Sequence, residues 1–245
     1  VLADLMENKG VNTYVAVLVA LLIGVAFGVV QGFLVAYLDI QPFIVTLAGM
    51  FFGRGMTAII STDMISIKNE LFLKWANFRF YMPFGSTNKK GKLIAVIVVI
   101  IIAVLLKYRK FGRKLYAIGG NRQSALMMGL NVKRTMFQAY VLDGFLAGLG
   151  GFLFCLNSCA GFVEQAKGLE MDAISSAVIG GTLLSGGVGT PIGTLFGVLI
   201  KGTISSLITT QGTLSSWWVR IILSLLLCFF IVIQSVIASM KKKSK

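Results

Sequence analysis

The chain has 245 residues, of which 56% are hydrophobic and only 13% are charged, and its mean hydropathy is +0.86. This composition excludes an ordinary soluble globular protein. A formal net charge of +14 would indicate nucleic-acid binding in a soluble protein, but here the cations cluster beside apolar segments. The sequence has no histidine, which excludes a mixed Cys/His metal site, and we interpret its three cysteines as small hydrophobic residues.

Six apolar segments are long enough, or nearly so, to cross the roughly 30 Å hydrocarbon core of a bilayer as helices. They are continuous and lack the alternation of a membrane β-strand, which favours helices over a barrel. We therefore predict an all-α, polytopic helical membrane protein with about six to eight membrane segments, some of them short or re-entrant. In chain order the six are Val11–Tyr37, Gln41–Ile60, Leu93–Leu106, Met136–Leu156, Pro191–Ile208 and Trp217–Met240.

Basic residues set the predicted topology. Residues 107–135 contain eight Lys or Arg residues and no acidic residue, and Lys241–Lys243 with Lys245 close the chain. Because positive residues gather on the cytoplasmic side of membrane proteins, both segments are predicted inside.

Alternation of the spans then places residues 61–92 outside, as an extracytoplasmic loop with short helices at most. This stretch is polar, mixed in charge, and contains Pro83 and Gly85. Its lysines at 89, 90 and 92 oppose the assignment, but the basic segment 107–135 is the stronger signal.

The basic segment contains a short predicted helix. Asn121 is a good N-cap, Arg122–Met128 is rich in helix formers, and Gly129 can take the left-handed position after the last turn. So short a helix is not stable alone in water, so it must dock on something. From the residues alone, its own loop, the membrane surface and a partner protein all remain open.

A second unusual region is rich in glycine. Met171–Leu184 would be only about 21 Å long as a helix, and the turn SGGVGTP (Ser185–Pro191) separates it from the next span. The Gly180–Gly189 region is therefore either the wall of a pathway through the membrane or a site of close helix packing. Glycines spaced four residues apart also occur in Val11–Tyr37 and in Met136–Leu156, where we expect them to let helices approach closely.

Four ionisable residues fall within predicted spans: Arg54, Asp143, Lys201 and Arg220. Charges within the membrane are functional candidates. Arg220 lies beside two tryptophans and is interpreted as an interface anchor. Asp143 is either protonated or faces a cation or water inside the bundle, and Lys201 matches its depth better than Arg54 does. A proton-coupled carrier could use such groups as a relay and is the main alternative function.

The chain is similar to the permease subunits of bacterial sugar ABC importers of the ribose/galactoside type. The resemblance is carried by YAIGGNRQSALMMGLNV, by GLEMDAISSAVIGGTLLSGGVGT, by PFIVTLAGMFFGRGM (Pro42–Met56) and by GTLSSWW (Gly212–Trp218). The last two bring it nearest to galactofuranose-type permeases. The four motifs occur in order over almost the whole chain, and they imply a single transmembrane permease domain over residues 1–245.

This resemblance implies that residues 107–135 form a cytoplasmic coupling loop, whose segment Gly119–Val132 seats on a separate cytosolic ATP-binding subunit. Gly120 and Asn121 would shape the start of the coupling helix, Ser124, Ala125 and Met128 would face the ATPase, and Gly129 would end the helix. The region Asp172–Gly189 would line or brace the sugar path.

The resemblance further implies a subunit without enzymatic activity or cofactor in the bacterial cytoplasmic membrane, moving a pentose or hexose such as galactofuranose by alternating access. Its partners would be two copies of the ATP-binding subunit or a fused pair, an extracytoplasmic sugar-binding protein and a second permease chain. The predicted path residues are Arg54, Asp143, Asp172, Gly180, Gly181 and Lys201. A membrane enzyme is disfavoured because the sequence has no nucleophile–base or metal constellation.

Two departures from the family are visible. The family's early glycine-rich motif would precede Val1, so the chain is expected to lack about the first quarter of the family's length. Asp143 stands where relatives usually carry a small hydroxyl residue.

Overall fold

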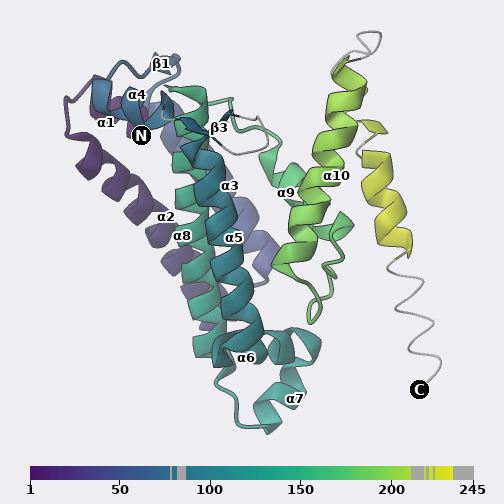
Figure 1. Cartoon of the computed structure of the whole chain (residues 1–245). Coiled ribbons are helices and arrows are strands. Elements are labelled where there is room, and N and C mark those ends of the chain that lie inside the picture. Colours follow the sequence, from purple (N-terminus) through teal and green to yellow (C-terminus); the bar gives the residue numbers. More distant parts are fainter. Residues whose placement is uncertain (78, 82–86, 211–217, 219–220, 223, 234–245) are drawn as a thin grey trace. The chain divides into compact units, whose positions relative to one another are not determined.

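The computed structural model describes residues 1–77, 79–81, 87–210, 218, 221–222 and 224–233 (Figure 1). The chain divides into two compact units. Unit 1 comprises Val1–Val98 and Gly129–Ala166, and unit 2 comprises Val99–Met128 and Lys167–Lys245. Residues 99–128 therefore belong to the same unit as the C-terminal part of the chain from residue 167 onward.

Unit 1 is built around the antiparallel pair α2 (Thr13–Ala36) and α8 (Val132–Ser158). Both helices begin at an asparagine whose side chain accepts a hydrogen bond from the first turn: Asn12 from the Tyr14 N–H, and Asn131 from the Arg134 N–H. Helix α3 (Pro42–Ile60) begins with proline at its first position and also contacts α2.

Glycine makes the contact between α2 and α8 possible. A methyl group on Gly144 would lie 2.8 Å from the Gly28 Cα and 2.9 Å from its nitrogen. A methyl group on Gly24 would lie 2.9 Å from the Gly148 Cα. The two backbones are therefore in direct contact, as the four-residue glycine spacing predicted.

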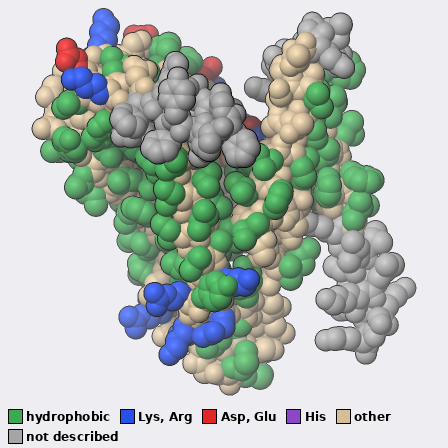
Figure 2. Space-filling model, in the orientation of Figure 1, with side chains coloured by type: hydrophobic (Ala, Val, Ile, Leu, Met, Phe, Trp, Pro, Cys, Tyr) green, Lys and Arg blue, Asp and Glu red, His purple; other side chains and the backbone are tan. Residues whose placement is uncertain are grey.

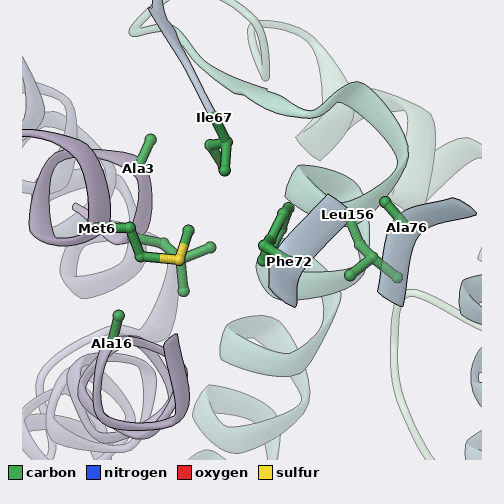
Figure 3. Close-up of a cluster of buried hydrophobic side chains, with 8 residues drawn as sticks. Ala3, Met6, Ala16, Ile67, Phe72, Ala76 and Leu156 are labelled. Carbon is green, nitrogen blue, oxygen red and sulfur yellow. The ribbon is translucent and has the colours of Figure 1, made fainter. Parts of the chain in front are cut away.

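One end of unit 1 carries a small apolar core (Figure 3). Side chains from α1, the start of α2, α4 and the end of α8 meet there, with Phe72 completely buried. The short elements of this end are α1 (Leu2–Glu7), β1 (Ile65–Ser66), α4 (Glu70–Asn77) and β4 (Ala160–Gly161), and β1 pairs antiparallel with β4. Helix α4 and strand β1, which belong to the loop predicted to be extracytoplasmic, therefore lie at this end of unit 1, and the side of the membrane that it faces stays a prediction.

The hairpin β2 (Arg79–Tyr81) and β3 (Thr87–Lys89) leads into α5 (Lys90–Tyr108), within which the boundary between the two units falls. The remaining helices of unit 2 are α6 (Lys110–Gly120), α7 (Arg122–Met127), α9 (Leu169–Ile179) and α10 (Pro191–Thr210). A shorter apolar helix spans Ser224–Ile233.

The predicted helical membrane architecture is confirmed. Among the described residues, α2, α3, α8 and α10 are long and apolar enough to cross a membrane, and Leu93–Tyr108 and Ser224–Ile233 are shorter apolar helices. At 11 residues, or roughly 16 Å, α9 is the short segment that the sequence predicted. Arg220, Trp217, most of GTLSSWW and the lysine tail lie outside the described residues.

Two features of the fold were not predicted. The strands are too short for an alternating pattern to indicate them. The basic segment contains α6 as well as the predicted short helix, because Phe111, Leu115 and Ile118 recur at helical spacing among the cations. Gly120 is consequently the last residue of α6, and it immediately precedes Asn121, the N-cap of α7.

Candidate functional site

The short helix α7 begins where the sequence predicted. The Asn121 side-chain oxygen accepts hydrogen bonds from the backbone N–H groups of Gln123 and Ser124, both at 3.0 Å. Gly129 follows the last turn with a φ of +74°, in the left-handed region that favours glycine. Asn121 also ends α6, since its N–H donates to the Ala117 carbonyl, so one residue joins the two helices.

The last residues of α7 and its C-cap residue Met128 expose an apolar surface. Leu126, Met127 and Met128 are exposed, Met127 by 82% and Met128 by 65%, and Lys and Arg side chains gather around this part of the structure (Figure 2). Ala125, by contrast, is fully buried within the chain, so its side chain does not contribute to that surface. Met127 was not among the predicted contact residues, although its exposure is the largest of the three.

The end of α6 lies directly against the glycine-rich turn between α9 and α10. A methyl group on Gly119 would lie 2.6 Å from the Gly187 nitrogen and 3.1 Å from its Cα. One turn earlier on α6, the Tyr116 hydroxyl donates a 2.6 Å hydrogen bond to the Gly189 carbonyl. Two segments about seventy residues apart in the sequence are thus joined by backbone contact and a hydrogen bond.

Glycine also brings α9 and α10 together. Any side chain on Gly180 would collide with the Gly193 backbone, and one on Gly197 would collide with the Ser176 carbonyl. Of the two interpretations that the sequence left open, this geometry favours close helix packing for Gly180. Gly181 has a φ of +89° and open space at its Cβ position, so it serves the turn.

An ion pair connects the same two helices. The Lys201 Nζ lies 2.7 Å from an Asp172 carboxylate oxygen, with the Lys201 side chain 16% exposed and that of Asp172 47% exposed. Lys201 lies roughly 15 Å along α10 from its first residue. Depth had suggested Asp143 as the partner of Lys201, and the observed partner is Asp172.

The remaining two predicted path residues belong to unit 1. Arg54 is half-buried on α3, and Asp143 is exposed on α8 immediately before Gly144 of the contact with α2. Their roles in a pathway stay predictions. Within the described residues, no group of three or more His, Cys, Asp or Glu side chains could hold a metal ion.

The family of this chain follows from its similarity to known proteins. The model of the family described as branched-chain amino acid transport system / permease component matches residues 1–231. The chain belongs to this family. It is a polytopic permease component of the cytoplasmic membrane, which confirms the predicted class.

Of three similar permeases, two are named for a sugar that they import. The chain is 44% identical over 83% of its length to the inner membrane ABC transporter permease protein YjfF of Escherichia coli (strain K12). It is 34% identical over 94% of its length to the fructose import permease protein FruG of Bifidobacterium longum (strain NCC 2705), and 39% identical over 84% to the ribose import permease protein RbsC of Bacillus subtilis (strain 168).

The chain spans 62%, 69% and 63% of the length of these three permeases, respectively. No solved structure is significantly similar to it. The predicted resemblance to permeases of sugar ABC importers is confirmed by these relatives.

Proposed function

We propose that this chain is the transmembrane subunit of an ATP-driven importer that moves a monosaccharide, a pentose or hexose, across the cytoplasmic membrane. The observation that carries the proposal is its similarity to ribose and fructose import permeases, at 39% and 34% identity over most of the chain. The chain itself would perform no covalent chemistry, and ATP would be hydrolysed by a separate cytosolic subunit.

The apolar surface of α7 supports a docking role. Leu126 and Met127, with the C-cap residue Met128, expose large hydrophobic side chains at the end of a six-residue helix, which is too short to be stable by itself. Methionine adapts well to a hydrophobic groove, and full burial of one such side chain contributes about 1.5–3 kcal/mol. In this role α7 seats in a groove of the ATP-binding subunit, with Asn121, Ser124 and Gly129 shaping the helix.

The Lys201–Asp172 pair supports a place for the sugar path along α9 and α10. A sugar offers hydroxyl groups that both donate and accept hydrogen bonds, and a half-exposed ion pair supplies partners of both kinds. Gly181 and Arg54 are further candidates for the path, while Gly180 serves helix packing.

Two further partners belong to this proposal. A sugar-loaded binding protein would dock at the end of unit 1 that α1, α4, β1 and β4 form. A second permease chain, identical or related, would complete the pathway.

Reconstitution tests the proposal. The full-length permease, co-purified with its ATP-binding subunit in proteoliposomes, should accumulate labelled ribose, fructose or galactose when the binding protein and ATP are supplied, and not when ATP is replaced by a non-hydrolysable analogue. Labelled leucine is the matched control, because the family description names branched-chain amino acids. Uptake of leucine instead of sugar would contradict the proposed substrate and indicate an amino acid instead. Uptake driven by an ion gradient without the ATPase would favour a secondary carrier.

A further inference from the structure

Two glycine pairs of unit 2 meet backbone to backbone. Gly119 and Gly120 end α6, while Gly186 and Gly187 lie in the turn between α9 and α10. A methyl group on Gly186 would lie 2.9 Å from the Gly119 carbonyl oxygen, and one on Gly187 would lie 2.7 Å from the Gly120 Cα. Gly119, Gly186 and Gly187 therefore leave no room for a side chain in this contact, whereas a methyl group on Gly120 would meet nothing within 4 Å.

The turn side of the contact is fixed. Gly186 and Gly187 have φ values of +91° and +77°, which only glycine adopts easily. The turn is closed by hydrogen bonds from the Leu183 N–H to the Val188 carbonyl and from the Gly186 N–H to the Leu183 carbonyl, both at 3.0 Å. Because α9 and α10 contact each other directly, the turn and these two helices form one continuous element.

The α6 side is also continuous with its neighbour. Asn121 accepts from α7 through its side chain and donates to α6 through its backbone, so no free linker separates the two helices. The Tyr116 hydroxyl bond to the Gly189 carbonyl then fixes α6 to the turn at a second point, one helical turn from Gly119. A displacement of α7 therefore reaches the turn without passing through a flexible segment.

We propose that this joint, made by Tyr116 and Gly119 of α6 with Gly186, Gly187 and Gly189 of the turn, transmits the movement of α7 to α9 and α10. The inference rests on the proposed function, in which an ATP-binding subunit moves α7. The five residues are positioning residues, since they would act through the helices that carry the ion pair. The contact accounts for glycine rather than alanine, the better helix former, at position 119, because a methyl group there would lie 2.6 Å from the Gly187 nitrogen.

Gly119→Ala tests the joint cleanly. Gly119 does not have a positive φ, so alanine fits its backbone, and the added methyl group meets only the turn. Gly202→Ala in α10 is the matched control, because a methyl group there meets nothing within 4 Å. The complete complex in proteoliposomes is compared for co-purification with the ATPase, ATP hydrolysis, and sugar transported per ATP hydrolysed.

Gly119→Ala is expected to retain the ATPase and its hydrolysis but to transport about tenfold less sugar per ATP, while Gly202→Ala stays within about twofold of wild type. Full sugar transport per ATP in Gly119→Ala would overturn the inference, and so would loss of the ATPase, because the contact would then serve assembly. A wild-type complex that transports no sugar with ATP would instead contradict the proposed function.

Tyr116→Phe is a second variant that tests the same joint if Gly119→Ala does not accumulate in the membrane. It removes one hydrogen bond and adds no bulk, so the protein should fold. Sugar transported per ATP should fall by roughly two- to tenfold, as expected for the loss of one hydrogen bond. A ratio equal to that of wild type would overturn the inference.

Discussion

Glycine-lined backbone contacts occur in both units, but they differ in what they join. In unit 1, glycines of α2 and α8 sit at regular spacing between two long, uninterrupted helices. In unit 2, Gly119 meets a turn in which Gly186 and Gly187 have positive φ, and the two helices that flank this turn are joined by an ion pair. The first contact holds two helices together along their length, whereas the second joins a surface helix to a turn. The same residue type therefore serves packing in one unit and, by our inference, transmission in the other.

The largest effect is expected when a bulky side chain is introduced into the contact between α2 and α8 of unit 1. Gly144→Leu would force the two backbones apart, because even a methyl group on Gly144 would lie 2.8 Å from the Gly28 Cα. Overpacking of this kind typically costs about 1–3 kcal/mol or more. We expect Tm in detergent to fall by roughly 5–10 °C, measured by thermal unfolding of the purified complex.

Gly150→Leu is the control on the same helix, because a methyl group at Gly150 meets nothing within 4 Å. It should leave Tm nearly unchanged. An equal fall of Tm in the two variants would show that α8 tolerates a larger side chain at neither position, and would contradict a specific role of Gly144 in the contact with α2.

The next largest effect is expected from breaking the Lys201–Asp172 ion pair. Lys201→Met leaves Asp172 without its partner, which should destabilise the protein by about 1–3 kcal/mol, because Asp172 is half-exposed and keeps some solvation. The double variant Lys201→Met with Asp172→Asn should recover much of this stability. If the pair lines the sugar path, uptake should remain low even in the stable double variant, and recovery of both stability and uptake would assign the pair to structure alone.

The apolar surface at the end of α7 is tested by replacing a methionine with a charged side chain of similar length. Met128→Glu would place a carboxylate in the proposed groove and should weaken binding of the ATP-binding subunit about tenfold, measured by titration of the reconstituted complex. Met128→Leu is the matched control, because it keeps volume and hydrophobicity. Unchanged binding with glutamate at this position would remove Met128 from the docking surface.

The smallest effect is expected at Asp143. It is exposed on α8, so Asp143→Ser should change Tm by about 1 °C or less and uptake by less than about twofold. Loss of uptake with normal assembly would place Asp143 in the sugar path after all.

Local chemistry was predictable from the sequence, and long-range pairing was not. The cap at Asn121 and the left-handed Gly129 follow from side-chain and backbone preferences that act within a few residues. The spans follow from hydropathy. Helix α6 was missed because its cations were given more weight than the spacing of Phe111, Leu115 and Ile118.

The contact of Gly119 with the turn was out of reach for a different reason. Backbone contacts leave no signature beyond the glycines themselves, and glycine pairs also occur in ordinary turns. The partner of Lys201 was misjudged because depth alone cannot choose among carboxylates on different helices. The buried position of Ala125 likewise depends on tertiary packing, which helix periodicity over six residues does not determine.

The central claim is that α6 moves together with α9 and α10. It is tested most directly by the distance between spin labels on Lys114 of α6 and Leu199 of α10, both exposed, in a cysteine-free complex without nucleotide and with trapped ATP. The account predicts one narrow, unchanged distance in the otherwise wild-type complex, and a distance that shifts or broadens with ATP when Gly119→Ala is added. A distance that already changes with ATP before that substitution, or identical behaviour of the two complexes, would contradict it.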